Sequence, residues 1–235
     1  MDNKVFFITG GSGFVGSNIA VGLKKYMENI TVIAMDNLRR RGSEFNIPRL
    51  QKNGVRFIHG DIRNREDLEL IGPINCIIEC SAESAVLAGY QGSDEYVLNS
   101  NLFGTINCLK IAKKYGADVI FLSTSRVYPI NAINAIKCYE TEKRYEILEH
   151  QELPGVSGKG ISETFPLQGV RSLYGATKLC SEFIIQEYLD HYLHTISVTP
   201  YLFVYSHNRT IVAVSLLILI MTYNAYKLLY DGISV

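Results

Sequence analysis

The sequence predicts an α/β fold in which helices flank a doubly wound parallel sheet. Three observations predict it: short apolar runs recur along the chain, helical periodicity fills the stretches between them, and polar or glycine residues follow the runs directly. Parallel sheets of this kind bind their ligands at the carboxyl ends of the strands. We therefore expect the polar strand ends to face one crevice.

The first expected strand covers residues 5–8 and runs directly into a glycine-rich turn. Its residues are all apolar, as in a strand that is buried on both faces of a sheet. The turn carries glycines at three-residue spacing: Gly10, Gly13 and Gly16. Without a Cβ, such a turn can bend tightly, approach a diphosphate and let the next helix pack closely. The N-terminus of that helix can bind an anion.

A second apolar run, residues 30–35, ends in Asp36, about 20 residues beyond the glycine turn. A carboxylate in this position can accept hydrogen bonds from an adenosine ribose, so the combination predicts a dinucleotide-binding unit of the Rossmann type. The arginines at 39–41 could instead bind a 2′-phosphate, which Asp36 would repel. We therefore expect NAD, with Asn37 and Arg39 beside it.

A third strand is expected at residues 56–59 and leads to Asp61 and Ile62. The Asp61 carboxylate could bind the adenine amino group while the Ile62 side chain covers the ring. Alternatively, Asp61 could cap a helix over residues 65–71, a role that aspartate often takes. Both interpretations are open from the sequence.

A fourth strand, residues 76–80, is followed by two small residues, Ser81 and Ala82. Their size would let a cofactor lie against the backbone. The helical periodicity then predicts one helix over about residues 96–115, which carries Asn101.

The fifth expected strand, residues 119–122, ends in Ser123 and Thr124, and a later helix carries Tyr174 and Lys178. The last two are four residues apart and so share one helix face. A tyrosine has a pKa of about 10, but a nearby ammonium and a cationic nicotinamide favour its phenolate. Tyr174 is then a usable base for a hydroxyl proton, with Lys178 lowering its pKa and binding the nicotinamide ribose, and Thr124 orienting the hydroxyl.

Six motifs occur in one order along the chain: TGGSGFVG, DNL, GDI, NLFGT, STSRVY and YGATK. In this order the chain resembles the extended short-chain dehydrogenase/reductase family of nucleotide-sugar epimerases and dehydratases, over about residues 4–195. The resemblance implies a tightly held NAD and a nucleotide-sugar substrate. The segments DNLRRRGSEFN and HGDIRNREDL are most similar to the branch that epimerises C2 of a CDP-activated 3,6-dideoxyhexose through a 2-keto intermediate.

The resemblance also admits other reactions of the same family. In the related 4,6-dehydratases, Asp-Glu follows the threonine of the fifth strand and performs the elimination, whereas Ser125 and Arg126 stand there in this chain. That difference argues against dehydration. A 4-epimerase, a dehydrogenase that releases NADH and an inactive NAD-binding remnant are the alternatives.

The expected site has two sets of residues. Proton transfer is assigned to Thr124, Tyr174 and Lys178. Cofactor binding is assigned to Gly10, Gly13, Phe14, Val15, Gly16, Asp36, Asn37, Arg39, Asp61, Ile62, Ser81, Ala82, Asn101, Ser123, Tyr174 and Lys178. No metal site is expected, because His191 and His194 lie three residues apart without further ligands nearby.

Two segments depart from the strand–helix alternation. Residues 130–172 are rich in charge and glycine, and we expect a surface excursion or lid within an NAD-binding domain at 1–196. From residue 197 the resemblance ends, so we expect the C-terminal substrate domain of the family to be largely missing. Within this atypical apolar tail, 197–235, the uncharged stretch 211–226 is interpreted as the product of a frameshift or truncation, as a genuine element packed on the sheet, or as a membrane anchor. The last is disfavoured because a span needs about 20 residues.

Composition narrows the class of protein. The chain has 235 residues, 47% of them apolar, and no net charge, which suits one sizeable core and provides no electrostatic basis for nucleic-acid binding. Its five cysteines are scattered without metal-binding spacing, and the apolar N-terminal run is too short for a signal peptide. We expect a cytoplasmic protein with reduced thiols. The resemblance implies homo-oligomers for full-length relatives.

Overall fold

A six-stranded sheet forms the centre of the protein. The structure is a computed structural model that describes residues 3–90, 93–162, 164–191 and 196–199. The strands are β1 (Lys4–Thr9), β2 (Ile30–Asp36), β3 (Arg56–His59), β4 (Cys76–Glu79), β5 (Asp118–Leu122) and β10 (Ile196–Thr199). They lie in the order β10-β5-β4-β1-β2-β3, and every neighbouring pair is parallel. This is the doubly wound order of a Rossmann sheet, so the predicted fold class is confirmed.

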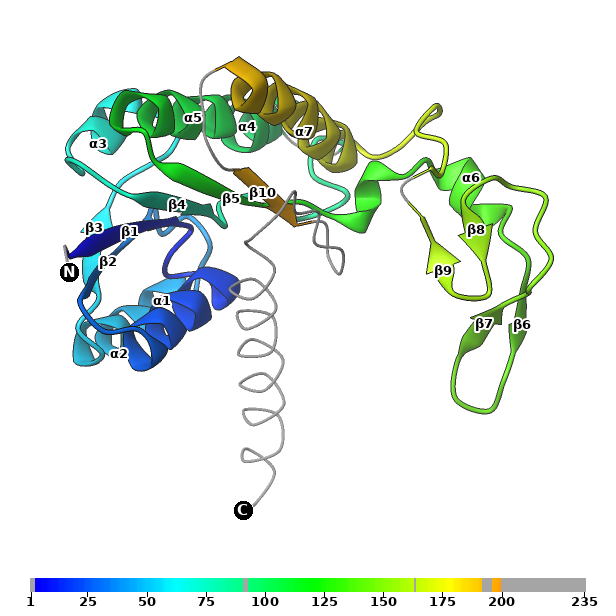
Figure 1. Cartoon of the computed structure of the whole chain (residues 1–235), viewed down its shortest axis with the longest axis horizontal. Helices are drawn as coiled ribbons and strands as arrows, with labels where there is room; N and C mark the ends of the chain where they lie inside the picture. Colours follow the sequence, from blue (N-terminus) through cyan, green and yellow to red (C-terminus); the bar gives the residue numbers. More distant parts are fainter. Residues whose placement is uncertain (1–2, 91–92, 163, 192–195, 200–235) are drawn as a thin grey trace.

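Helices cover both faces of this sheet (Figure 1). On one face lie α1 (Phe14–Tyr26) and α2 (Ile47–Lys52), the second preceded by the short turn η1 (Ser43–Asn46). On the other face lie α3 (Arg65–Glu69), α4 (Asp94–Leu98), α5 (Gly104–Tyr115) and α7 (Leu173–His191).

The core has two halves, one on each side of the sheet. Phe7 and Ile77 belong to the half beneath α5 and α7, whereas Ile8 and Ile78 belong to the half above α1. Successive strand residues point to opposite faces, and here both faces are buried. This explains why the strands are continuous apolar runs and not alternating ones.

The helix expected over residues 96–115 is interrupted. A π-helical turn, η2 (Asn99–Phe103), separates α4 from α5. A Cβ on Gly104 would overlap the Ile62 side chain, so this glycine lets α5 approach the loop after β3 closely. Apolar spacing could not reveal the interruption, because one wide turn changes the periodicity too little.

Residues 130–172 form an arm at one side of the sheet (Figure 1). The arm contains α6 (Ile130–Asn134), the ribbon β6 (Cys138–Glu140) with β7 (Tyr145–Ile147), and the ribbon β8 (Val156–Ser157) with β9 (Gly160–Ile161). At its base the rings of Tyr128 and Phe165 pack edge to face, with centroids 5.3 Å apart. The arm adds no strand to the six-stranded sheet.

Strand β10 pairs with β5 in the sheet, and three of its residues, 197–199, belong to the expected tail. The remaining tail, including residues 211–226, lies outside the described residues. Within the described ranges no helix is long and apolar enough to cross a membrane. All five cysteines are free thiols.

A substitution of Leu109 tests the packing of the core. Its side chain on α5 is fully buried, and Leu109→Ala removes contacts that the surroundings cannot replace. We expect a loss of about 2–5 kcal/mol in the free energy of unfolding. The neighbouring Lys110 is exposed, so Lys110→Ala should change the free energy of unfolding by less than about 0.5 kcal/mol. Urea denaturation of both variants checks this, and equal effects would contradict the packing described.

Candidate functional site

The glycine-rich turn between β1 and α1 forms one wall of a pocket of about 450 Å³. Gly10 has φ of 60°, and a Cβ on it would lie 2.8 Å from the carbonyl oxygen of Cys80 at the end of β4. A Cβ on Gly16 would overlap the carbonyl oxygen of Gly10. Glycine is therefore required at both positions. The turn presents backbone, not side chains, to the pocket.

The N-terminus of α1 points its positive end at this pocket. Gly13 precedes the helix without a side-chain cap, and its carbonyl oxygen accepts the N–H of Ser17 at 3.0 Å. The N–H groups of Phe14, Val15 and Gly16 come before that first helical bond, and all three residues line the pocket. No acidic residue occupies the first turn. The turn therefore suits a diphosphate.

Asp36 ends β2 at the rim of the same pocket. Its Oδ2 accepts the N–H of Ser12 at 3.2 Å, and its Oδ1 accepts the N–H of Leu38 at 2.9 Å. Leu38 has φ of 55°, which turns the chain sharply after the strand. The carboxylate thus fixes the glycine turn relative to β2. Because an ionised carboxylate offers about four lone-pair positions, acceptor capacity is left for ribose hydroxyls.

Asp61 lies at the end of β3 and is only partly buried. Its carboxylate accepts hydrogen bonds from Nδ2 of Asn37 at 2.9 Å and from Nη2 of Arg63 at 2.7 Å. Burial works to raise the pKa of Asp61, but the hydrogen bonds from Arg63 and Asn37 outweigh it and lower the pKa. Asn64, not Asp61, stands at the N-terminus of α3. The alternative role of Asp61 as the cap of this helix is therefore wrong.

Arginine and tyrosine side chains pack together beside the pocket. The Arg39 guanidinium lies 3.8 Å from the ring centroid of Tyr96, and that of Arg63 lies 4.7 Å from it. Nη1 of Arg40 donates to Oγ of Ser84 at 2.8 Å. These contacts join the loops after β2, β3 and β4 around one opening.

Most of the predicted cofactor residues line the pocket: Gly10, Gly13, Phe14, Val15, Gly16, Asp36, Asn37, Arg39, Asp61, Ile62, Ser81 and Ala82. The sequence reasoning missed further lining residues: Met35, Arg40, Ser43, Gly60, Cys80, Glu83, Ser84, Tyr96 and Ser100. Most of them adjoin a predicted strand end, and this position is the feature of the sequence that could have identified them. Tyr96 and Ser100 are four residues apart on a helical segment, a spacing too common to single them out.

Asn101 does not line the pocket but supports its wall. The side chain is fully buried. Its Oδ1 accepts the N–H of Glu83 at 2.7 Å, and its Nδ2 donates to the carbonyl oxygen of Glu83 at 3.1 Å and to Oγ1 of Thr177 at 3.3 Å. Glu83 lines the pocket and Thr177 lies on α7. Asn101 therefore joins the pocket wall to α7.

Tyr174 and Thr124 do not line the pocket and belong to a second group at the end of β5. A Cβ on Gly175 would overlap the carbonyl oxygen of Arg126 in the short turn η3 (Ser125–Val127), so the first turn of α7 packs directly against this turn. Thr124 precedes η3, and its Oγ1 accepts the N–H of Arg126 at 3.2 Å. The close approach brings the helix turn that carries Tyr174 to the end of β5.

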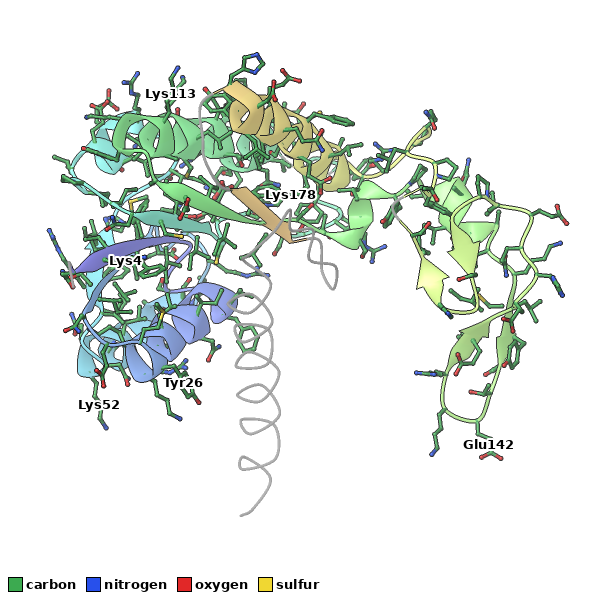
Figure 2. All side chains as sticks on the ribbon, in the orientation of Figure 1. Lys4, Tyr26, Lys52, Lys113, Glu142 and Lys178 are labelled. Atoms are coloured by element: carbon green, nitrogen blue, oxygen red, sulfur yellow. The ribbon has the colours of Figure 1, made fainter. Side chains whose placement is uncertain are left out.

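Lys178 lies on the inner side of α7, between the helix and the sheet (Figure 2). It is 2% exposed, and its Nζ lies 4.2 Å from the ring centroid of Phe121. Burial lowers the pKa of Lys178, against the attraction of Glu79. Ser123, at the end of β5, donates its hydroxyl hydrogen to Oε1 of Glu182 on α7. The two predicted cofactor-binding residues of this paragraph, Ser123 and Lys178, thus lie in the interior beside the carboxyl ends of β4 and β5.

No group of three or more His, Cys, Asp or Glu side chains within the described ranges could hold a metal ion. His191 has its Nδ1 3.1 Å from the carbonyl oxygen of Glu187 one turn earlier. His194 lies outside the described residues.

Comparison with known proteins identifies the family to which this chain belongs. The pattern that defines the NAD dependent epimerase/dehydratase family matches residues 6–221, and the chain belongs to this family. The expected cofactor is confirmed at this level, because the family is NAD dependent, and the glycine cradle fits such a group. The match extends past residue 195, beyond the end of the resemblance that the motifs indicate.

Two curated proteins illustrate the relationship. The chain is 30% identical over 186 residues to CDP-paratose 2-epimerase of Salmonella typhi, covering 77% of this chain and 52% of that protein. It is 34% identical over 124 residues to the low-salt glycan biosynthesis protein Agl12 of Haloferax volcanii, covering 52% of this chain and 39% of that protein. The chain thus spans about half the length, or less, of these relatives.

Solved structures share the fold. The dTDP-glucose 4,6-dehydratase DesIV of Streptomyces venezuelae, with NAD and TYD bound, superposes with a TM-score of 0.64 at 25% identity, over 83% of this chain and 55% of that one. The UDP-N-acetylglucosamine 4-epimerase of Methanobrevibacter ruminantium M1 gives a TM-score of 0.62 at 22% identity, over 85% and 54%. Both comparisons agree with the Rossmann sheet described above.

Gly16→Ala tests the cradle. The added methyl group would overlap the carbonyl oxygen of Gly10, so the turn must open and the amides at the start of α1 must move. We expect NAD affinity, measured by calorimetry, to fall at least about tenfold, the equivalent of 1.4 kcal/mol. Gly158→Ala is the control, because a Cβ there makes only ordinary contacts near 3.8 Å. Unchanged affinity in the Gly16 variant would refute the cradle.

Asp61→Asn tests the electrostatics at the end of β3. The pKa of Asp61 is lowered from 3.8, so its ionised form stabilises the fold above that pH and loses this effect as pH falls through the lower folded value. We expect the variant to melt below the wild type at pH 7 and the difference to shrink in strongly acidic solution. Glu142→Gln, exposed in the β6–β7 turn, should melt like the wild type at both pH values. A difference that did not vary with pH would contradict the assignment.

Proposed function

We propose that this chain supplies the cofactor-binding and proton-transferring part of a nucleotide-sugar epimerase. The proposed reaction inverts C2 of a CDP-3,6-dideoxyhexose, converting CDP-paratose to CDP-tyvelose through a 2-keto intermediate. The observation that carries the proposal is the glycine cradle joined through Asn101 to the helix that bears Tyr174 and Lys178. The similarity to CDP-paratose 2-epimerase supports the choice of sugar.

The protein's part in holding NAD follows from the pocket. The amides at the start of α1 would bind the diphosphate, and Asp36 would accept hydrogen bonds from the adenosine ribose. Asp61 would accept one from the adenine amino group, with Ile62 against the ring. When bound, NAD supplies a reversible acceptor for hydride.

Proton transfer falls to the residues around the end of β5. Tyr174 would take the proton of the C2 hydroxyl as that carbon is oxidised to a ketone, and return it when the carbon is reduced from its opposite face. The ammonium of Lys178, one helical turn further on, favours the phenolate. Thr124 would orient the sugar hydroxyl. No net oxidation results, because the hydride removed from C2 is the one returned.

Elimination of water is not part of the proposal. Ser125 and Arg126 occupy the two positions after Thr124, and both side chains are exposed. A hydroxyl and a guanidinium cannot replace a carboxyl pair in general acid–base catalysis, since arginine does not release its proton in proteins.

A second candidate is a protein that binds NAD without turning over a sugar. The observation in its favour is that most of the expected cofactor residues line the pocket, whereas Tyr174 and Thr124 do not. Under the first candidate, the protein would serve O-antigen sugar synthesis for lipopolysaccharide in a bacterial cytoplasm, and full-length relatives would be homo-oligomers. A 4-epimerase or a dehydrogenase of the same family would use the same cofactor and base.

The test is incubation of the purified, NAD-loaded protein with CDP-paratose, with product analysis by NMR. We expect CDP-tyvelose and no accumulation of NADH. Tyr174→Phe removes the base and should lower turnover at least about 100-fold while NAD binding is retained. Tyr145→Phe, in the exposed β6–β7 ribbon, is the matched control and should act like the wild type.

The other outcomes separate the candidates. Accumulation of NADH would indicate a dehydrogenase. A folded, NAD-loaded protein that leaves CDP-paratose unchanged would contradict the C2 epimerase and favour the non-catalytic binder.

A further inference from the structure

A carboxylate that has no place in the proposed mechanism lies in the middle of the protein. Glu79 is the last residue of β4 and is fully buried. Its Oε1 accepts the hydroxyl hydrogen of Thr105 at 2.6 Å, whereas Oε2 makes no hydrogen bond to the described residues. A carboxyl group this deep is costly to ionise unless a positive charge lies near it.

The strand register shows where that charge lies. Glu79 is directly opposite Phe121 in the parallel pair β4–β5, so both side chains point to the same face of the sheet. The ammonium of Lys178 lies over the ring of Phe121, 4.2 Å from its centroid. The carboxyl group of Glu79 and the amine of Lys178 therefore lie in one buried layer between the sheet and α7.

A second carboxylate approaches Lys178 along α7. Glu182 follows Lys178 by one helical turn and is half-buried. Its Oε1 accepts the hydroxyl hydrogen of Ser123, two residues beyond Phe121 on β5. Lys178 thus has one acidic residue beside it on the sheet and another on its own helix.

Apart from Tyr174, which shares its face of α7, the other titratable groups that act on Lys178 are thiols. Cys80 follows β4 and Cys108 lies on α5, and burial raises the pKa of both thiols far above the neutral range. They therefore remain uncharged. Within the described residues, Glu79 and Glu182 are the carboxyl groups that act to raise the pKa of Lys178, with Glu79 first, while burial raises the pKa of both carboxyl groups themselves.

We infer that Glu79 is a positioning residue, a buried counter-ion that holds the amine of Lys178 in its protonated form over Phe121. Glu182, held by Ser123, adds a weaker contribution from the partly exposed side. The consequence for catalysis rests on the proposed function: a protonated Lys178 is what favours the phenolate of Tyr174. Without the counter-ion, burial favours the neutral amine and that effect is lost.

A direct titration of Lys178 tests the inference in the cofactor-free full chain. Lysine labelled with ¹³C at Cε is followed by NMR over pH, and the Lys178 signal is assigned by its loss in Lys178→Arg. Glu79→Gln preserves size and removes the charge, so the pKa of Lys178 should fall by at least about one unit. Glu182→Gln should lower it by less. Glu187→Gln, exposed on the same helix, is the control and should leave it unchanged.

A second variant guards against a folding defect. Glu79→Met removes the same charge with an apolar side chain of similar volume, and should lower the Lys178 pKa as Glu79→Gln does. A Lys178 pKa equal to that of the wild type in whichever variants fold would overturn the inference, since Glu79 would then be uncharged or too distant to act.

The enzymatic consequence is measured separately. With CDP-paratose as substrate, the alkaline limit of kcat should move to lower pH in Glu79→Gln, while KM stays near the wild-type value. If the wild type turns over no CDP-paratose, the proposed function fails. The titration of Lys178 still decides the inference in that case, because it needs neither substrate nor cofactor.

Discussion

The arrangement of the site depends on how closely the turn after β1 approaches the end of β4. Gly10 lies against the carbonyl group of Cys80, and Gly16 lies against Gly10 itself. A side chain at either position would push α1 away from the sheet and withdraw its N-terminal amides from the pocket. This close approach is possible because neither glycine carries a Cβ. It depends on free space and not on an attractive force. Every function considered for this chain requires it.

The second constraint is the burial of ionisable side chains in the interior. Lys178 and Glu79 are both buried between the sheet and the α5–α7 layer, where an isolated charge of either sign would be strongly disfavoured. Thr105 joins this layer through its bond to Glu79, and its hydroxyl also reaches the carbonyl oxygen of Asn101 at 2.8 Å. Asn101 in turn holds the pocket wall. The cofactor cradle and the buried charges are therefore parts of one polar network.

Much of the fold was predictable because it follows from local rules. Continuous apolar runs predicted β1, β2 and β4 within a residue or two, since strands covered on both faces need no polar positions. The interruption of the helix by η2 was not predictable in this way, because a single wide turn changes the apolar periodicity too little. Likewise, Asp61 is equally suited by sequence to cap α3, and the start of this helix decides against it, because Asn64 precedes the first helical residue.

The sequence by itself determined the class of site: glycine spacing and the acidic end of β2 are local features whose chemistry can be read one motif at a time. Tertiary structure decided which of the named residues face the pocket. Asn101 and Ser123 share the polar character of true lining residues, yet their side chains bond to Glu83 and Glu182 instead. The same holds for the environment of Lys178. Glu79 lies 99 residues earlier in the chain, and only the register of β4 with β5 brings its carboxyl group into the layer that holds Lys178.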